Sequence, residues 1–480
     1  MTDSIKTSFA VIGSGPGGSI TAACLAEAGY QVLLVEEGSN LALDSAPHFS
    51  LEEISQKYRN GGITVGMGKT KVAYVEGRVV GGGSEINRGL YHRIHRETLE
   101  QWKRDYKVES LSLDLLTPNY KICEDISKVS DLPVAPPDYS IKLHEGAVSL
   151  GWKSRQVPRL VLYQKDSQGR VTGRKESMTT TWIPRFIAAG GTLMSDTRIK
   201  KIRQRGNKWY LDGVKQVNGH QPVKIVENGL FIACGAIHTP ALLRRSGLKK
   251  NIGNSLKFHP MLKVVAQFKD EINQADGIDP VHQVVEFDPR FSMGVSMSLK
   301  PLLSLTMLDH PDYLAEVDKN WKHMGIYYVQ STKGSAIVRN VPGYTDPLIR
   351  INMGPAELAD IEEGLIKLCE VLFAAGATVI YPGIVGSPVF RSPNDFKKIN
   401  SSLLLGRANL STLHLFSSCP MGENPKKCAA DSYGKVHGVD RLYINDASLL
   451  CGPTIINPQA TVMAIAHRNI QEFLNKRANK

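Results

Sequence analysis

The chain has 480 residues, of which 42% are hydrophobic, so it is long enough to bury a large core and is expected to form two domains. The formal net charge is +12, but the lysines and arginines are spread along the chain without a basic run interleaved with aromatic residues, which argues against nucleic acid as a partner. A solvated basic face explains this charge, and an anionic partner or a membrane surface is the alternative.

The sequence lacks the segments that would direct it into or across a membrane. No apolar stretch is long enough to span a bilayer, and no apolar signal segment precedes the first predicted strand. The seven cysteines are odd in number, scattered and without Cys-x-x-Cys spacing, which is typical of a reducing compartment and argues against a zinc site or a disulfide scaffold. We therefore expect a cytoplasmic protein with no integral membrane segment and no metal site.

A glycine-rich turn lies near the N-terminus, between an apolar run and a stretch of small residues. The run from Ser8 to Ile12 predicts a buried parallel strand, and Ser19 to Ala28 predict a helix. Between them Gly13, Gly15 and Gly18 form G-x-G-x-x-G, which permits a tight turn, close approach of a pyrophosphate to the backbone, and close packing of the helix on the strand. The free N–H groups at the start of the helix then face the phosphates.

A second predicted strand, Gln31 to Val35, ends at the acidic residue Glu36. This carboxylate lies about 20 residues after the glycines, where an acidic side chain binds a ribose hydroxyl group. The order of strand, glycines, helix, strand and acid predicts a dinucleotide site rather than a purely structural glycine turn. It does not distinguish FAD from NAD, although an acid at this position argues against the 2′-phosphate of NADP.

Three consecutive glycines, Gly81 to Gly83, lie in a loop that continues through Ser84 to Asn87. Consecutive glycines do not form a regular element, and they allow backbone N–H groups to approach a flat or anionic group. We interpret the loop as a second cofactor contact, and a plain glycine-rich connector is the alternative.

Further parts of the nucleotide-binding fold are expected in the middle of the chain. A helix is predicted from Met178 to Ala189 and a strand from Thr192 to Ile199. Residues Leu230 to Pro240 again have the order of strand, glycine and helix start, and Gly247 is suited to end that helix. The nucleotide-binding fold is therefore expected to be discontinuous, with strands from the N-terminal part, from about residues 190–250 and from the C-terminus.

Between about residues 255 and 400 the pattern becomes that of an antiparallel sheet. The segments with strand-like alternation are Met261–Phe268, Gln283–Phe287, Gly325–Gln330, Ala336–Val341 and Pro347–Met353. A helix is predicted over Ala356–Ala375, so that helices cover one side of the sheet, an arrangement suited to closing a substrate site over a cofactor. We interpret the apolar run from Met297 to Met307 as core, with a lid as the alternative.

Four ordered segments resemble the glucose–methanol–choline (GMC) oxidoreductase family, whose members are FAD enzymes that oxidise alcohols. These segments are the Arg78–Asn87 loop, Gly235–Gly247, Leu442–Ser448 and Asn457–Thr461, and the resemblance covers almost the whole chain. It implies an α/β fold class with a discontinuous Rossmann-type FAD-binding domain, residues 1–254 and 401–480. Residues 255–400 would form an α+β substrate domain built on an antiparallel sheet.

The resemblance also implies roles for single residues. His414, seven places before Met421, matches the catalytic histidine of the family, and Asn457 matches the second member of the active-site pair. The cofactor-binding residues that we expect are Gly13, Gly15, Gly18, Glu36, Gly82, Gly83, Ser84, Asn87, Ile199, Asp446, Ala447 and Pro458.

A histidine and an asparagine suit the chemistry of alcohol oxidation. The histidine accepts the hydroxyl proton while a hydride leaves the carbon for flavin N5, and the neutral asparagine holds the substrate oxygen. We expect a small-molecule primary or secondary alcohol to be oxidised to an aldehyde or ketone, with oxygen or another electron acceptor reoxidising the FAD. Two alternatives remain open: a non-redox enzyme of the hydroxynitrile-lyase type on the same scaffold, and a flavin-binding relative without activity.

The chain departs from the family pattern in the glycine loop. Some members carry a histidine there that binds the flavin covalently, but this chain has Val80 and Ile86, so we expect non-covalent FAD. The position after the asparagine is Arg88, where small residues are common. We interpret Arg88 as a structural ion pair or a contact to the cofactor phosphates, with binding of an anionic or polyhydroxylated substrate as the alternative. The nearby residues to which no role is assigned are Tyr91, His92 and His259.

Overall fold

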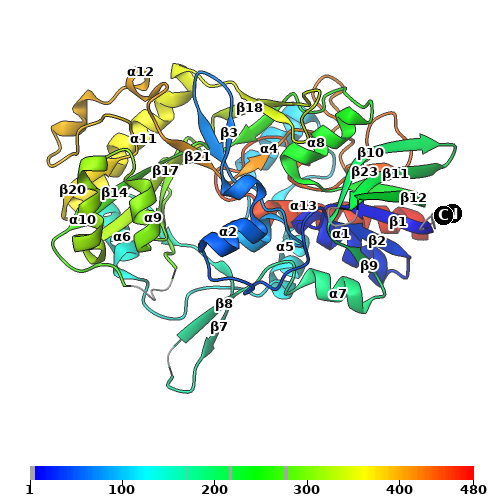
Figure 1. The fold of residues 1–480 in the computed structure, drawn as a ribbon, viewed down its shortest axis with the longest axis horizontal. Coiled ribbons are helices and arrows are strands. Elements are labelled where there is room, and N and C mark those ends of the chain that lie inside the picture. Colours follow the sequence, from blue (N-terminus) through cyan, green and yellow to red (C-terminus); the bar gives the residue numbers. More distant parts are fainter. Residues whose placement is uncertain (1–5, 170, 216–218, 275–278, 480) are drawn as a thin grey trace.

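The computed structural model describes residues 6–169, 171–215, 219–274 and 279–479. They form two halves, each built on its own large sheet, with the two chain ends close together at one end of the molecule (Figure 1). One half is Rossmann-like and the other contains an antiparallel sheet covered by helices, so the predicted α/β fold class is confirmed.

The Rossmann-like sheet has seven strands in the order β10-β11-β12-β1-β2-β9, with β23 paired to β12. Their bounds are β1 (Lys6–Ile12), β2 (Val32–Val35), β9 (Thr192–Met194), β10 (Thr197–Arg205), β11 (Lys208–Lys215), β12 (Gly219–Ile232) and β23 (Leu442–Ile444). The strands β9-β2-β1-β12-β23 are parallel to their neighbours. Strand β11 pairs antiparallel with β12, and β10 pairs antiparallel with β11. The strands of this sheet come from distant parts of the chain, as the sequence predicted.

Helices cover the Rossmann-like sheet and bury its central strand, β1. The helices concerned are α1 (Pro16–Glu27), α5 (Leu113–Ile126), α7 (Trp182–Ala188), α8 (Gly235–Arg245) and α13 (Gln459–Ala478). Helix α1 packs between α13 and α7, and α5 packs on α13. Phe9, Ala10 and Val11 of β1 are fully buried between these layers. The predicted N-terminal helix begins three residues earlier than expected, because Pro16 can occupy the first helical turn, where a backbone N–H is not needed.

The predicted strand from Thr192 to Ile199 is in fact two strands. Asp196 adopts a left-handed conformation (φ 52°) between β9 and β10, and its carboxylate accepts a hydrogen bond from Ser39 Oγ at 2.6 Å. The break lets β9 continue the parallel row beside β2 while β10 turns away to pair with β11. The helix predicted from Met178 begins at Trp182, after a turn.

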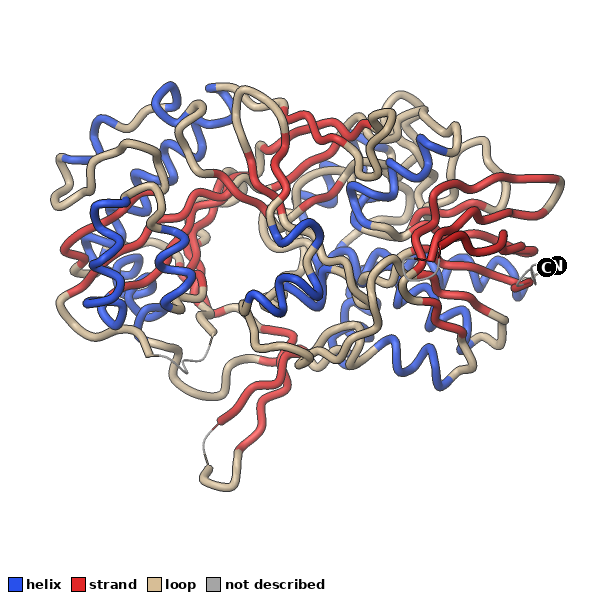
Figure 2. The backbone as a smooth tube through the Cα atoms, viewed as in Figure 1, coloured by secondary structure: helices blue, strands red, loops and turns tan. Residues whose placement is uncertain are grey.

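The second large sheet has nine strands in the order β3-β4-β21-β14-β17-β16-β15-β6, with β20 paired to β14. Helices lie against strands in both halves of the molecule (Figure 2). Their bounds are β3 (Thr64–Gly66), β4 (Val72–Tyr74), β6 (Ser154–Gln156), β14 (Met261–Phe268), β15 (His282–Val284), β16 (Phe291–Ser296), β17 (Met324–Ser331), β20 (Ala377–Pro382) and β21 (Leu410–Thr412). Three segments outside residues 255–400 thus contribute strands, and the domain boundaries themselves stay a prediction.

The helices of this half are α6 (Asp138–Ser149), α9 (Lys300–Thr306), α10 (Leu314–Asn320) and α11 (Pro355–Ala374). Strand β14 has its predicted bounds, and its residues alternate between two apolar clusters: Val264 packs in the cluster that includes α11, whereas Val265 packs with α9 and α10. The alternation of side chains along a strand thus gives the sheet two covered faces.

The interpretation of Met297–Met307 as core was only partly right, because the segment forms helix α9 rather than a buried strand. Pro301 occupies the first turn of the helix, and Leu303 and Met307, four residues apart on one helical face, are fully buried on the sheet. Leu305, on another face, is 53% exposed and lines a cavity described below.

Shorter helices and strands complete the fold. Their bounds are α2 (Leu51–Lys57), α3 (Gly83–Ile86), α4 (Arg96–Tyr106), α12 (Ser401–Leu404), β5 (Val129–Ser130), β7 (Arg159–Lys165), β8 (Val171–Lys175), β13 (Leu256–Phe258), β18 (Gly334–Arg339), β19 (Leu348–Ile351) and β22 (Leu415–Phe416). Strand β13 pairs with β22, so the C-terminal segment is joined to the start of the second half. Among the described residues, no helix is long and apolar enough to cross a membrane.

Close packing at the start of α1 generates a stability prediction. A Cβ atom added at Gly18 would lie 1.9 Å from the carbonyl oxygen of Gly13, whereas one added at Gly15 would meet nothing within 4 Å. We expect Gly18→Ala to lower the free energy of unfolding of the apoprotein by at least about 1–3 kcal/mol, because the backbone must move to admit the methyl group. Denaturant unfolding of the apoprotein measures this effect, with Gly15→Ala as the control in the same loop. Equal stability of the two variants would contradict the packing argument.

Candidate functional site

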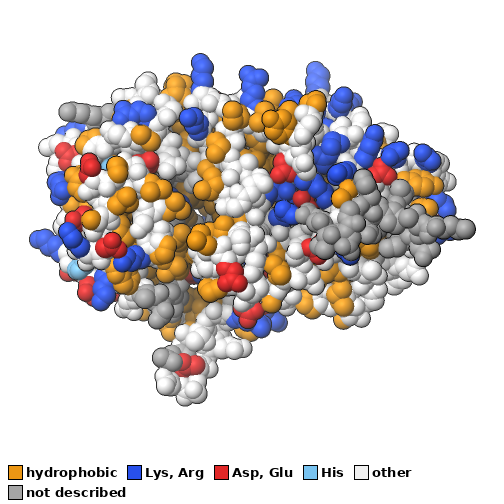
Figure 3. Space-filling view, in the orientation of Figure 1, with side chains coloured by type: hydrophobic (Ala, Val, Ile, Leu, Met, Phe, Trp, Pro, Cys, Tyr) orange, Lys and Arg blue, Asp and Glu red, His pale blue; other side chains and the backbone are white. Residues whose placement is uncertain are grey.

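A cavity of about 560 Å³ lies between the two large sheets and is lined by residues of both. In the space-filling view, hydrophobic side chains surround a hollow between the two halves (Figure 3). The predicted site residues that line the cavity are His414, Asn457, Gly13, Gly15, Glu36, Gly82, Gly83, Ser84, Asn87, Ile199, Asp446, Ala447 and Pro458. Gly18 does not line it, because this glycine packs against the turn beneath. Residues from distant parts of the chain therefore meet at one cavity.

The first glycine turn presents open backbone to the cavity. Gly13 has a positive φ of 99°, and a Cβ atom there would lie 2.2 Å from the carbonyl oxygen of Ala233. Gly15 precedes α1, whose first turn carries no acidic residue and no side-chain cap. The N–H groups and the positive dipole end of α1 are thus available to an anionic group such as a pyrophosphate.

The second glycine loop packs directly on the first. A Cβ atom at Gly82, where φ is 58°, would lie 3.0 Å from Cα of Gly15, and the N–H of Gly81 donates to Ser14 Oγ at 3.0 Å. Gly83 lines the cavity and has open space on its side-chain side. The two loops together form a cradle without side chains, which fits a dinucleotide lying against the backbone.

Glu36 is held at the wall of the cavity by hydrogen bonds. Its Oε2 accepts from the N–H of Ser14 at 2.9 Å and from Ser14 Oγ at 2.7 Å, and its Oε1 accepts from the N–H of Gly38 at 2.9 Å. Burial raises the pKa of this carboxyl group, although the three hydrogen bonds act in the opposite direction. Oε1 keeps a lone pair for a ribose hydroxyl group.

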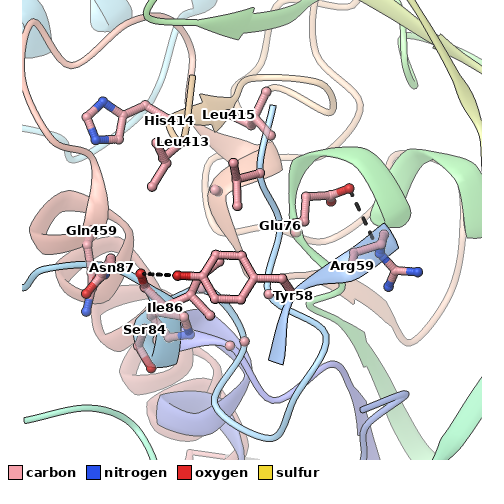
Figure 4. A pocket seen from close by; sticks show the side chains of 18 of the residues that line it. Tyr58, Arg59, Glu76, Ser84, Ile86, Asn87, Leu413, His414, Leu415 and Gln459 are labelled. Atoms are coloured by element: carbon pink, nitrogen blue, oxygen red, sulfur yellow. Dashed lines mark hydrogen bonds and ion pairs between the residues drawn. The ribbon is translucent and has the colours of Figure 1, made fainter. Parts of the chain in front are cut away.

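An ion-pair cluster next to Glu36 was not anticipated from the sequence. Glu37 pairs with Arg59 at 2.8 Å and with Arg198 at 3.2 Å, and Asp346 lies 2.9 Å from Arg198. Burial acts to raise the pKa of Glu37, but the hydrogen bond and charge of Arg59 together with Arg198 outweigh it and lower the pKa to about 2. Arg59 also faces Glu76 across the cavity wall (Figure 4). The cluster fixes this end of the cavity with its charges already paired.

The two predicted catalytic residues are in contact. His414 lies between β21 and β22, and Asn457 lies just before α13, yet His414 Nε2 and Asn457 Nδ2 are 3.0 Å apart. The backbone N–H of His414 donates to Thr412 Oγ1 at 3.1 Å, which holds the turn that carries the imidazole. In Figure 4 the His414 ring lies at the edge of the cavity beside Leu413 and Leu415.

His259 lies on the other side of the His414 ring, and no role was assigned to it from the sequence. The two Nδ1 atoms are 3.1 Å apart, and the rings meet edge to face with centroids 5.2 Å apart. His259 is fully buried, and its Nε2 has no hydrogen-bond partner among the described residues. Its position just before β14, in a His-Pro pair, was the only available signal, and it does not reveal a contact across the fold.

With Nδ2 of the Asn457 amide facing the imidazole ring, these contacts correspond to one arrangement of the histidine protons. Because Asn457 Nδ2 can only donate, His414 Nε2 accepts and carries a lone pair, so the ring proton of His414 is on Nδ1. That Nδ1–H then donates to His259 Nδ1. Burial lowers the pKa of His414 to about 4 and lowers the pKa of His259 well below its ordinary value. Both rings are therefore neutral at neutral pH, and His414 is ready to accept a proton at Nε2.

Arg88 forms the ion pair that was expected of it. Its guanidinium group donates to Asp279, and Arg159 donates to the other oxygen of the same carboxylate. Arg88 also lies over the ring of Phe49, with 5.3 Å between the guanidinium carbon and the ring centroid. The charge of Arg88 is thus paired with Asp279, whereas its Nε and Nη1 atoms have no hydrogen-bond partner among the described residues.

Comparison with known proteins gives a consistent result. The family model described as GMC oxidoreductase matches residues 54–261 with its N-terminal part and 333–466 with its C-terminal part, and a model described as an NAD(P)-binding Rossmann-like domain matches residues 11–54. The GMC-type oxidoreductase y4nJ of Sinorhizobium fredii is 35% identical over 98% of this chain and 95% of its own length. The long-chain-alcohol oxidase FAO4A of Arabidopsis thaliana is 25% identical over 98% of this chain and 69% of its own length.

Two solved structures share the fold across the whole chain. A pyridoxine 4-oxidase from Mesorbium loti has a TM-score of 0.73 at 16% identity, covering 98% of this chain and 99% of that one. A formate oxidase from Aspergillus oryzae RIB40, studied for the modification of its FAD, has a TM-score of 0.75 at 14% identity and covers 100% of both chains.

The open space at Gly15 generates a prediction about cofactor binding. Gly15 lies in extended backbone at the cavity (φ −63°), so alanine fits the apoprotein without strain, and its methyl group would occupy open space beside this glycine turn. We expect Gly15→Ala to weaken FAD binding by tenfold or more, because the pyrophosphate would lose its close approach to the backbone. Titration of the apoprotein with FAD measures this. Unchanged FAD affinity would show that the cofactor does not lie against this turn.

Proposed function

The chain belongs to the GMC oxidoreductase family, and on this premise we propose that it is an FAD-dependent enzyme that oxidises a primary or secondary alcohol to an aldehyde or ketone. The observation that carries the proposal is the contact between His414 Nε2 and Asn457 Nδ2 at the wall of the cavity that the two glycine loops also line. A proton acceptor and a neutral hydrogen-bond donor are thereby placed beside a dinucleotide cradle.

The residues around the cradle fit FAD. The α1 N-terminus and the loop at Gly82 and Gly83 would hold the pyrophosphate, Glu36 the ribose, and Asp446 with Pro458 the flavin end. FAD in a structural neighbour supports the same choice. We further propose that the FAD is bound non-covalently, because the aligned positions in the glycine loop are Val80 and Ile86, which offer no nucleophile.

The mechanism follows from the hydrogen bonds around His414. An alcohol in the cavity would displace the Asn457 N–H from the single lone pair of His414 Nε2 and donate its hydroxyl proton there, and the released N–H of Asn457 would donate to the alcohol oxygen. Bound FAD supplies the two-electron acceptor for the hydride that leaves the carbinol carbon, and oxygen or another electron acceptor would reoxidise it. Holding both side chains on one substrate makes the proton transfer effectively intramolecular.

His259 would stabilise the histidinium that results. When His414 gains a proton at Nε2, its Nδ1–H still donates to His259 Nδ1, and the bond becomes a charge-assisted one. His259 has a lowered pKa and therefore stays neutral, so it remains an acceptor throughout the pH range in which His414 is active.

The cavity wall on the side of the second sheet supports a substrate with an apolar body. Its apolar residues are Met261, Val295, Met297, Leu302, Leu305 and Ile326. The long-chain-alcohol oxidases among the relatives are consistent with such a substrate class.

We predict that the His414→Ala variant keeps its bound FAD. The rate constant for reduction of the flavin by an alcohol substrate should fall by a factor of about 10²–10⁴, the usual contribution of a positioned general base. Stopped-flow measurement of flavin absorbance under anaerobic conditions tests this. The control is His323→Ala, which removes a partly exposed histidine that is not among the residues lining the cavity. If the His414→Ala variant reduces its flavin at the wild-type rate, His414 is not the proton acceptor.

The pH dependence of the same rate gives a further prediction. Only neutral His414 accepts a proton, and its lowered pKa of about 4 keeps it neutral as the pH falls from 8 to 5. The rate constant for anaerobic flavin reduction should therefore stay flat over that range and fall about tenfold per pH unit below about 4. Circular dichroism in the same buffers establishes that the protein is folded. A fall centred near pH 6.5, as for an ordinary histidine, would contradict the assignment.

A further inference from the structure

Lys263 lies on the cavity wall that the second sheet provides. It occupies the middle of β14, and its cross-strand neighbour on β17 is Tyr328, which also lines the cavity. The side chains that line the cavity around this part of the sheet are mostly apolar: Met261, Ile326, Met297, Leu302 and Leu305. A lysine side chain in such surroundings needs a reason, because an ammonium group loses hydration when it is buried.

Among the described residues, each carboxylate that lines the cavity has partners other than Lys263. Glu37 and Glu76 contact Arg59, and Asp279 is shared by Arg88 and Arg159. The two remaining lining carboxylates are bonded to backbone N–H and hydroxyl groups: Glu36 to Ser14 and Gly38, and Asp446 to Gly235, Thr239 and Ser448.

The other cations that line the cavity are likewise engaged. Arg198 pairs with Glu37, and Arg245 donates to the carbonyl oxygen of Lys200 and to Asn340. Within the described part of the chain, the ammonium group of Lys263 has neither an ion pair nor a hydrogen bond. Burial lowers the pKa of Lys263, and no neighbouring carboxylate offsets this effect.

The position of Lys263 separates it from the reacting centre. Met261 pairs with Ser411 of β21, and Lys263 lies two residues further along β14, roughly 7 Å of strand. Because β14 and β21 are antiparallel, this direction leads away from His414 at the end of β21. Lys263 is also on the opposite sheet from the glycine turn at Gly13 to Gly18. Lys263 therefore lines the part of the cavity that the second sheet provides, away from the end of β21 that leads to His414.

We propose that Lys263 binds a carboxylate carried by the alcohol substrate, so that the substrate is a hydroxy acid with an apolar body and its hydroxyl group at the end remote from the carboxylate. The proposal rests on the proposed alcohol oxidation for the identity of the reacting group. A carboxylate brings the one negative charge that a single ammonium group neutralises, whereas a phosphate monoester would bring up to two. The ion pair would form in a largely apolar site, where charge-assisted hydrogen bonds are strong.

Binding of non-reacting ligands tests the proposal on the FAD-loaded enzyme. The probes are straight-chain carboxylates of 4 to 12 carbons and the matched primary amides, titrated by calorimetry. We expect at least one carboxylate to bind the wild type tenfold or more tightly than its amide. Lys263→Met should bring this ratio close to one, and Lys263→Arg should keep much of it. Lys269→Met, which removes an exposed charge just beyond the end of the same strand, is the matched control and should leave the ratio unchanged.

Three results would overturn the proposal: no carboxylate preferred over its amide by the wild type, an undiminished preference in Lys263→Met, or loss of FAD from Lys263→Met, which would assign the lysine to the cofactor. The probes carry no hydroxyl group, so their binding does not depend on turnover. The two proposals can fail separately. If carboxylates are preferred through Lys263 but no alcohol reduces the flavin, the proposed oxidation is wrong and the anion site at Lys263 is retained.

Discussion

A line of three hydrogen-bonded side chains, Asn457, His414 and His259, is the constraint on which the rest of the molecule depends. Each residue comes from a different segment: Asn457 precedes the last helix, His414 lies between two short strands, and His259 lies at the entry to the second sheet. The line forms only if the C-terminal segment returns to both halves. Pairing of β23 with β12 and of β22 with β13 achieves this return, and it explains why the Rossmann-like half is assembled from distant parts of the chain.

The two ends of the cavity differ in charge: the nucleotide end has paired charged residues, and the catalytic end has neutral histidines. At the nucleotide end, buried charges are matched: Glu37 is kept ionised by Arg59 and Arg198, so this wall is rigid and its charge is fixed. At the catalytic end, burial acts without a carboxylate partner, and both His414 and His259 are held neutral. A neutral histidine is a proton acceptor once the substrate replaces Asn457 at its Nε2, and the same environment would favour its return to the neutral form after the reaction.

The parts of the fold that local sequence encodes could be predicted, and the parts that depend on contacts across the fold could not. The order of β1, the glycine turn, α1 and β2 follows from neighbouring residues, and so does the position of Glu36 at the end of β2. His414 and Asn457 were identified by family resemblance, since nothing local distinguishes them from structural residues. The left-handed turn at Asp196 splits the strand predicted over Thr192–Ile199, and the turn-prone pair Ser195 and Asp196 was the local signal for it.

Residues whose roles arise from tertiary neighbours were missed for the same reason. His259 matters because its ring meets His414, Arg198 because it reaches Glu37, and Lys263 because no acid of the described residues reaches it. The segment from Met297 to Met307 shows how an apolar run can mislead, because a helix that buries one face and lines a cavity with another has the same composition as a core strand.

The measurement that tests the account most directly is the visible spectrum of the purified protein under anaerobic conditions during addition of primary and secondary alcohols. We predict that the protein carries oxidised flavin and that one class of alcohol bleaches its visible absorbance. The amount of aldehyde or ketone formed should equal the amount of flavin reduced. A flavin that dithionite reduces but that keeps its oxidised spectrum while a substrate is consumed would contradict the redox function and favour a lyase on the same scaffold.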